Sequence, residues 1–92
     1  MNSPAPYDVV LSLAGHDQGK FFLVTGAEEG RLLLCDGRNR RLENPKRKSP
    51  KHVRVVLPGS DKPESDSAIR KTLALAASGA AGKEEKLLGE RR

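Results

Sequence analysis

A basic segment in the middle of the chain carries the residue types that could do chemistry. The stretch RRLENPKRKSPKHVRVV runs from residue 40 to residue 56, and two prolines interrupt its cations. Residues 38–57 contain eight Lys or Arg and a single acid, Glu43, whereas the whole chain has a net charge of +5. Arginine binds phosphate through paired N–H donors, and lysine binds it as a point charge. Such a concentration of positive charge predicts a polyanionic partner.

The cations of this window are the first candidate phosphate-binding residues. They are Arg38, Arg40, Arg41, Lys46, Arg47, Lys48, Lys51 and Arg54. Neutralising about five phosphates would make log K fall by roughly 3.5 to 4.5 units per decade of salt. The alternative is a solvated loop that is basic for solubility, although a surface of mixed sign would serve that purpose equally well. The chain has no Trp, one Tyr and two Phe, so few aromatic rings can stack on single-stranded bases.

Other residue types that could do chemistry are isolated in the sequence. His16 and His52 have no partner at metal-ligand spacing, so we expect no metal site. Asp17 and Asp36 are single turn acids and do not form a general acid and base pair. The chain has no Ser–His–Asp order, phosphate-binding glycine loop or dinucleotide fingerprint. We therefore expect neither an enzyme nor a bound cofactor.

The single cysteine, Cys35, ends an apolar run. We expect it to be a buried small hydrophobic side chain, with a reactive thiol as the alternative. One cysteine cannot form an internal disulfide, which fits a reducing compartment. The first residues lack the basic and apolar segments of a signal peptide, and no apolar run is long enough to span a membrane. We expect a cytoplasmic, monomeric protein without membrane contact.

The segments around the basic window must position it. Short apolar or alternating runs, separated by Gly, Asp and Pro, predict five strands. These strands span residues 7–15, 20–26, 31–35, 38–43 and 51–58. In this interpretation Asp36 and Gly37 form a two-residue hairpin turn, the fourth strand is itself basic, and residues 44–50 form a loop. The pattern favours a mainly β protein, with a small, strongly bent five-stranded barrel over residues 7–58.

The composition changes after the last predicted strand. Residues 59–64 are a polar linker, and residues 65–78 predict a short helix with Ser or Asp available as its N-cap. An apolar stripe at helical spacing consists of Ile69, Leu73 and Ala76. This stripe either packs on the barrel or docks on a partner protein. Residues 79–92 are of low complexity and predict a disordered tail.

The first two predicted strands carry a recognisable pattern. VVLSLAGHDQGKFFLVTG, from residue 9 to residue 26, consists of a strand, a polar turn between Gly15 and Gly19, and a second strand. The pattern resembles the KOW motif, which occurs in several ribosomal proteins and transcription elongation factors. Gly19 stands where the motif has its characteristic glycine, with Lys20 beside it.

The resemblance extends over residues 8–75. The segments RLLLCDG, PKHVRVV and SDSAIRKTL, together with the basic run, are similar to small bacterial KOW-domain RNA-binding proteins. These are related to KOW-bearing large-subunit ribosomal proteins of archaea and eukaryotes, in which a basic strand leads into a KHL-like segment. That segment corresponds here to Lys51, His52 and Val53. The chain departs from the family in lacking a basic N-terminal arm and in having an acidic pair at residues 28–29.

The resemblance implies an SH3-like barrel that binds RNA, in many relatives ribosomal RNA. It adds Lys20 and His52 to the candidate RNA-binding residues. RNA helices are recognised mainly by shape, phosphates and 2′-hydroxyls, which suits a cationic surface with few aromatic rings. We therefore expect a partner in ribosomal particles, as part of a ribonucleoprotein with a role in translation.

Two other functions remain open from the sequence. The first is an adaptor that docks on a ribosomal protein or on RNA polymerase, and such docking should depend on Ile69 and Leu73. The second is binding to duplex DNA, which has weaker support because the sequence shows neither a recognition helix nor a paired half-site feature.

Overall fold

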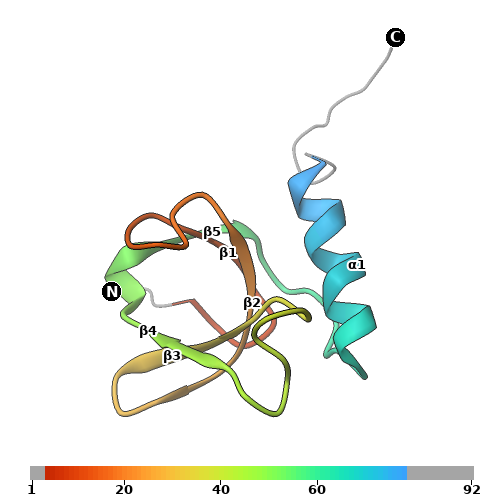
Figure 1. Ribbon diagram of the computed structural model, residues 1–92, viewed down its shortest axis with the longest axis horizontal. Helices are drawn as coiled ribbons and strands as arrows, with labels where there is room; N and C mark the ends of the chain where they lie inside the picture. The colour runs from red at the N-terminus through yellow and green to blue at the C-terminus, as the bar shows by residue number, and fades with distance from the viewer. Residues whose placement is uncertain (1–3, 79–92) are drawn as a thin grey trace, which may run out of the picture.

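The computed structural model describes residues 4–78, which form five β-strands and one α-helix. The elements are β1 (Val9–Ser12), β2 (Phe21–Glu28), β3 (Arg31–Cys35), β4 (Lys46–Lys48), a 3-10 turn (Pro50–His52), β5 (Val53–Leu57) and α1 (Asp66–Ala77). The strands form one antiparallel sheet in the order β4-β3-β2-β1-β5, with α1 beside it (Figure 1). The expectation of a mainly β protein with a short helix is confirmed. The predicted tail, residues 79–92, lies outside the described residues.

Two irregularities bend the sheet. The pairing register shifts between Val9 and Val10 in β1 and between Val24 and Gly26 in β2. Shifts of this kind bend a strand and increase its twist. The two edge strands, β4 and β5, are consecutive in the chain and are joined only by residues 49–52, so the edges of the bent sheet approach each other. No ladder pairs β4 with β5 within residues 4–78, and the sheet is therefore open.

Both faces of the sheet are covered by apolar side chains, because successive residues of a strand point to opposite faces. One face carries a buried cluster of Val10, Phe22, Val24, Leu32, Leu34 and Val53. The other face carries Val9, Leu23 and Cys35, which pack with Ile69 of α1. Side chains of β3 and β5 share the first cluster although β2 and β1 lie between these strands, so the sheet curls round that face. The unbroken apolar run of β2 is explained by its central place and by the helix on its second face.

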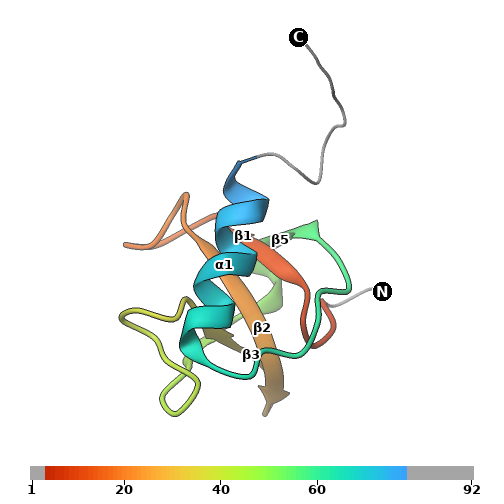
Figure 2. The same ribbon diagram turned by 90° about the vertical axis from the view of Figure 1, so that its right-hand side faces the viewer.

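The helix packs on the sheet through its apolar stripe. α1 begins after the N-cap Ser65, whose Oγ accepts a hydrogen bond from the N–H of Ala68 at 3.2 Å. Ile69 is completely buried, and Leu73 and Ala76 pack partly buried against the same cluster. Figure 2 shows α1 lying across the face of the sheet at β1 and β2. The first interpretation of the stripe, packing on the sheet, is confirmed. No helix within residues 4–78 combines the length and the apolar character needed to cross a bilayer.

The prediction of the fourth strand was wrong. Residues 38–43 contain no strand, and β4 (Lys46–Lys48) lies inside the segment that was predicted to be a loop. The Asp36-Gly37 pair does not form a two-residue hairpin, because both N–H groups donate to the carbonyl of Arg40, at 2.8 and 3.1 Å. This closes a local loop, and the chain pairs with β3 only several residues later. Pro45 immediately precedes β4, where an edge strand tolerates a residue without an N–H donor.

Candidate nucleic-acid interface

Strand β4 holds the middle of the basic window against a buried carboxylate. Nζ of Lys46 lies 2.8 Å from Oδ2 of Asp17, and Nζ of Lys48 lies 3.0 Å from Oδ1. Lys48 also donates to the carbonyl of Ala14 at 2.8 Å, and the hydroxyl of Ser12 donates to Oδ1 of Asp17 at 2.7 Å. The side chains of Lys48 and Asp17 are only 10% and 8% exposed. Two of the predicted phosphate-binding lysines therefore fasten the β1–β2 turn to β4.

The charges in this Asp17 cluster (Asp17, Lys46, Lys48 and Ser12) compensate one another only in part. Burial by itself raises the pKa of Asp17, but the ion pair with Lys46 and the hydrogen bonds from Ser12 and Lys48 together outweigh it and hold that pKa well below its ordinary value. Asp17 is therefore ionised at neutral pH. A single carboxylate between two ammonium groups leaves the cluster with one uncompensated positive charge, at Lys46, whose side chain is 29% exposed.

Arg47, between the two lysines, points to the opposite side of β4. Its Nη2 lies 3.0 Å from Oε1 of Glu28 at the end of β2, and the two side chains are 59% and 51% exposed. Exposed ion pairs contribute only about 0–1 kcal/mol. Arg47 can therefore exchange Glu28 for a phosphate at little cost, whereas Lys48 cannot leave Asp17 without leaving a buried carboxylate short of a partner.

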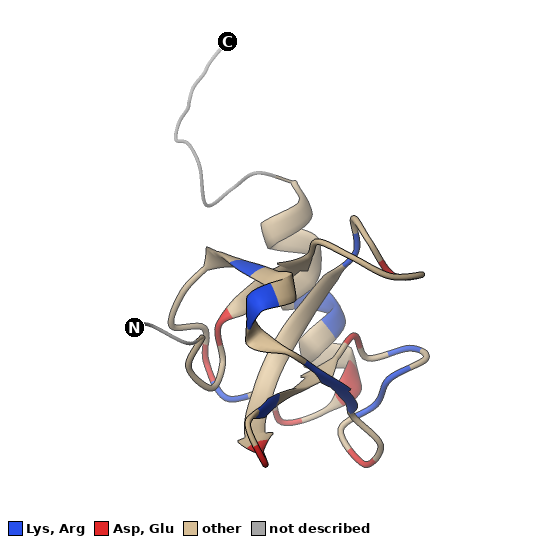
Figure 3. Ribbon diagram, turned by 90° about the vertical axis from the view of Figure 1, so that its left-hand side faces the viewer, with Lys and Arg blue, Asp and Glu red and all other residues tan. Residues whose placement is uncertain are grey.

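The connection between β3 and β4, residues 36–45, holds three arginines in a different setting. Within residues 4–78, no ion pair links Arg38, Arg40 or Arg41 to an acidic side chain. The nearby carboxylate of Asp36 binds the backbone and not the arginine side chains. Its Oδ1 accepts hydrogen bonds from the N–H groups of Arg38 and Arg40 at 2.8 and 2.9 Å. The blue segments of β4 and of this connection lie next to each other in Figure 3. The connection therefore offers guanidinium groups whose charge is uncompensated.

The N-terminal half of α1 holds this connection in place. Gly37 is buried, with a φ of 78°, and a Cβ on it would lie 2.5 Å from the carbonyl oxygen of Asp66. Nη1 of Arg70 donates to the carbonyl of Gly37 at 2.6 Å, and the N–H of Leu42 donates to Oδ1 of Asp66 at 2.9 Å. The helix thus fixes the arginine-bearing connection at both ends of its turn.

A groove runs between the β1–β2 turn and the β3–β4 connection and continues along α1. The part between the turn and the connection has a volume of about 220 Å³, and the part against α1 has a volume of about 310 Å³. Lys20 and Asp36 line both parts, so the two adjoin each other. The basic side chains that line this cationic groove are Lys20, Arg38, Arg40, Lys46 and Arg70. Its acidic lining consists of Asp17 and Asp36, and the first of these is already engaged with lysine.

The structure divides the ten predicted RNA-binding residues among several places. Lys20, Arg38, Arg40 and Lys46 come together at the groove. Arg41 is exposed on the same connection, Arg47 lies on the other side of β4, and Lys48 is almost completely covered. Lys51, His52 and Arg54 are exposed on the 3-10 turn and on β5. Four of the predicted residues therefore line one groove, and the other six lie outside it.

Sequence reasoning missed Arg70 and Asn39 at the groove, and it treated His16 only as a turn residue or metal ligand. Arg70 directly follows the fully buried Ile69 on α1. Its place at the edge of the helix interface was a weak signal, because the sequence does not show which loop would meet that edge.

The lone cysteine matches the prediction of a buried small side chain. Cys35 is completely buried, and burial raises the pKa of its thiol although a hydrogen bond with Thr25 acts in the other direction. Its Sγ donates to the carbonyl of Arg41 at 3.3 Å. In the part of the chain that the structure describes, no three His, Cys, Asp or Glu side chains gather where they could hold a metal ion.

The polar turn between β1 and β2 has a glycine with positive φ at each end, Gly15 and Gly19. Gly19 has a φ of 88°, and a Cβ on it would meet nothing within 4 Å. Glycine is therefore favoured there by conformation, not by crowding. Comparison of the sequence with protein-family models and with curated proteins gives no match. The cationic groove is thus the main basis for assigning a function.

Proposed function

We propose that this protein binds structured RNA, with ribosomal RNA as the first candidate, through the cationic groove. The observation that carries the proposal is the convergence of Lys20, Arg38, Arg40 and Arg70 on one groove from three separate parts of the fold. None of these four cations forms an ion pair with an acidic side chain among residues 4–78. A chain of phosphates along the groove would supply the missing negative charge.

The resemblance of the sequence to KOW-domain proteins favours RNA over other polyanions. The positive φ of Gly19, with Lys20 after it at the mouth of the groove, is compatible with that motif. The curled sheet, whose two edge strands are joined by residues 49–52, is compatible with the SH3-like barrel of the family. The proposal therefore includes that fold as well as the ligand.

The salt dependence of binding tests the groove. About four phosphate contacts would make log K for RNA fall by roughly 3 units per decade of salt. Replacing both Arg38 and Arg40 with Ala should reduce this slope by about 1.5. The matched control replaces Lys51 and Arg54 with Ala, which removes the same charge outside the groove and should change the slope less. Fluorescence anisotropy with a labelled ribosomal RNA hairpin measures both, and equal losses would contradict the groove.

Sedimentation with ribosomal particles tests the identity of the RNA. We expect the protein to sediment with the large subunit at low salt and to leave it after added salt or ribonuclease. Sedimentation that resists both treatments would support the alternative, a protein-docking adaptor. Such an adaptor would need a surface other than Ile69, because that side chain is completely buried under α1.

A further inference from the structure

We infer that the part of the groove against α1 receives one unpaired nucleobase of the bound RNA, with a preference for guanine. The inference rests on the proposed RNA-binding function and states which feature the RNA must offer. A duplex contacted only through phosphates would need a cationic surface and nothing more. The helix side of this groove has a different composition.

The floor of this base pocket is apolar. Phe21 and Leu73 line it and are partly buried against the core cluster of α1, so they have fixed positions. Ala74 and Ala77, both exposed, leave the space beside them open. The volume of about 310 Å³ falls at the small end of ligand sites, which span roughly 300–1,000 Å³. A flat heterocycle matches such a floor, and a phosphate group does not.

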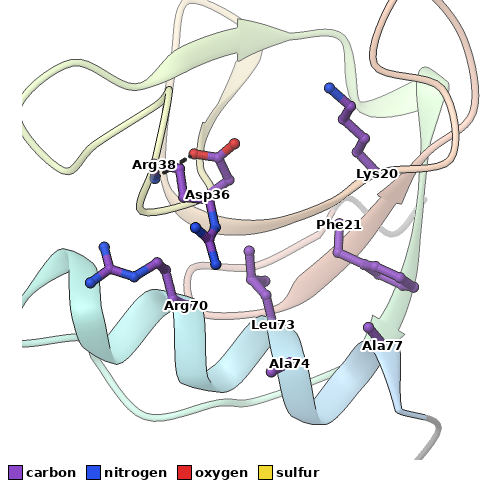
Figure 4. A pocket seen from close by; sticks show the side chains of 8 residues that line it. All are labelled: Lys20, Phe21, Asp36, Arg38, Arg70, Leu73, Ala74 and Ala77. Carbon is purple, nitrogen blue, oxygen red and sulfur yellow. Dashed lines mark hydrogen bonds between the residues drawn. The ribbon is translucent and has the colours of Figure 1, made fainter.

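The rim of the pocket is cationic. Figure 4 shows Lys20 on one side of the opening and Arg38 and Arg70 on the other, with Leu73 between them. Arg70 is held by its hydrogen bond to the carbonyl of Gly37, so its guanidinium is ordered before a ligand arrives. An unpaired base inserted here would have its two flanking phosphates within reach of opposite sides of the rim. Bases in bulges and loops of RNA stack on aromatic rings and on guanidinium planes. The lining of this pocket includes one aromatic ring, Phe21, and two arginines.

Asp36 gives the pocket its selectivity. Its Oδ1 already accepts two backbone N–H groups, whereas its Oδ2 accepts no hydrogen bond from the described residues. A free carboxylate oxygen accepts from N–H donors. The Watson–Crick edge of guanine presents two adjacent donors, N1–H and N2–H, and uracil presents one donor between two carbonyl oxygens. Guanine should therefore bind most tightly and uracil least.

Two RNA hairpins test the inference on the full-length protein. One is fully paired, and the other differs only by a single bulged guanosine. One stacked base should tighten binding by about tenfold at fixed salt, measured by fluorescence anisotropy. Replacing the bulged guanosine with uridine should remove most of this gain. Equal affinity for the paired and bulged hairpins, with normal salt dependence, would overturn the base pocket and leave the RNA-binding proposal intact. Failure of both hairpins to bind would overturn both.

Two variants locate the effect. Ala74→Gln fills the open space with an uncharged side chain at an exposed helix position, so the preference for the bulge should fall to about one. Ser67→Gln makes a similar change at an exposed helix position away from the pocket and should keep the preference. An undiminished preference in Ala74→Gln would contradict the pocket.

Asp36→Asn tests the selectivity separately. The amide oxygen can still accept the two backbone N–H groups, so the connection keeps its shape, but the other atom becomes a donor. The preference should then move from guanine toward uracil by about tenfold, because a charge-assisted hydrogen bond is lost and a carbonyl acceptor is now favoured. A purely structural role for Asp36 would change the affinity for both bases alike, and that result would overturn the selectivity.

Discussion

Strand β4 and the connection that precedes it carry the same number of cations and use them differently. Lys46, Arg47 and Lys48 of β4 all contact acidic side chains, and two of them share the buried Asp17. The connection carries Arg38, Arg40 and Arg41, and among residues 4–78 no acidic side chain pairs with them. The number of cations in a segment of sequence therefore does not equal the number that are free to bind a ligand. What decides is whether the fold has already supplied the counter-ion.

The largest expected effect on stability comes from removing the carboxylate that pairs with the lysines of β4. Asp17→Ala leaves the nearly buried Lys48 without its carboxylate, which should lower the free energy of unfolding by about 3–5 kcal/mol. The matched change at the exposed pair, Glu28→Ala, should cost about 1 kcal/mol or less. Urea denaturation measures both. Similar losses for the two variants would mean that the Asp17 cluster is no more important than a surface pair.

The conformation of the β3–β4 connection requires a glycine at residue 37, and Gly37→Ala should disrupt that conformation. The new Cβ would lie 2.5 Å from the carbonyl oxygen of Asp66, in a residue with a φ of 78°. Gly30 also has a φ of 78°, but a Cβ there meets nothing within 4 Å. Gly30→Ala should therefore cost only the conformational strain, about 1–2 kcal/mol, and Gly37→Ala should cost clearly more. Equal changes in thermal and urea stability would show that the contact with α1 does not matter.

Acid should weaken the Asp17 cluster in a defined direction. The folded pKa of Asp17 lies below its unfolded value, which is about 3.9. Its stabilisation is therefore complete above about pH 4 and falls by up to about 1.4 kcal/mol per pH unit below that. The difference in unfolding free energy between the natural protein and Asp17→Asn should be constant near neutral pH and shrink in acid. A difference that grew as the pH fell would contradict the assigned ion pairs.

The smallest expected effect on stability comes from the uncompensated side. Replacing Arg38, Arg40 and Arg41 together with Ala removes no ion pair formed within residues 4–78, so the free energy of unfolding should change by about 1 kcal/mol or less. RNA affinity should nevertheless fall, and the salt slope should decrease by about 2. Arg47→Ala, at the exposed pair, should change the slope by at most about 1. A stable triple variant with unchanged RNA affinity would exclude the connection from the binding site.

Particular elements show where sequence reasoning succeeded. Gly15 and Gly19 marked the first turn, and both have positive φ. The apolar run from Phe21 to Val24 marked the central strand, and the stripe of Ile69 and Leu73 marked the packed face of the helix. Each of these signals is local, because a backbone conformation or a face of an element follows from neighbours within a few residues.

The fourth strand shows where the same reasoning failed. Composition placed it at residues 38–43, because Asp-Gly is a common two-residue hairpin turn. In the structure, Asp36 instead bonds its own downstream backbone, and Gly37 is enclosed by α1, a contact across about thirty residues of chain. The basic residues 46–48 have no apolar pattern that marks a strand. They form an edge strand because their backbone pairs with β3 and because Lys46 and Lys48 form ion pairs with Asp17.

The sequence by itself determined that this protein is small, mainly β and strongly basic in one window, with a short helix that has an apolar stripe at Ile69 and Leu73. These properties follow from residue type, spacing and local chain conformation. Only the tertiary structure decided which cations are already paired, and that Lys20, Arg38, Arg40 and Arg70 line one groove. Ion pairing and convergence depend on distances between segments far apart in the chain, and a single sequence does not contain those distances.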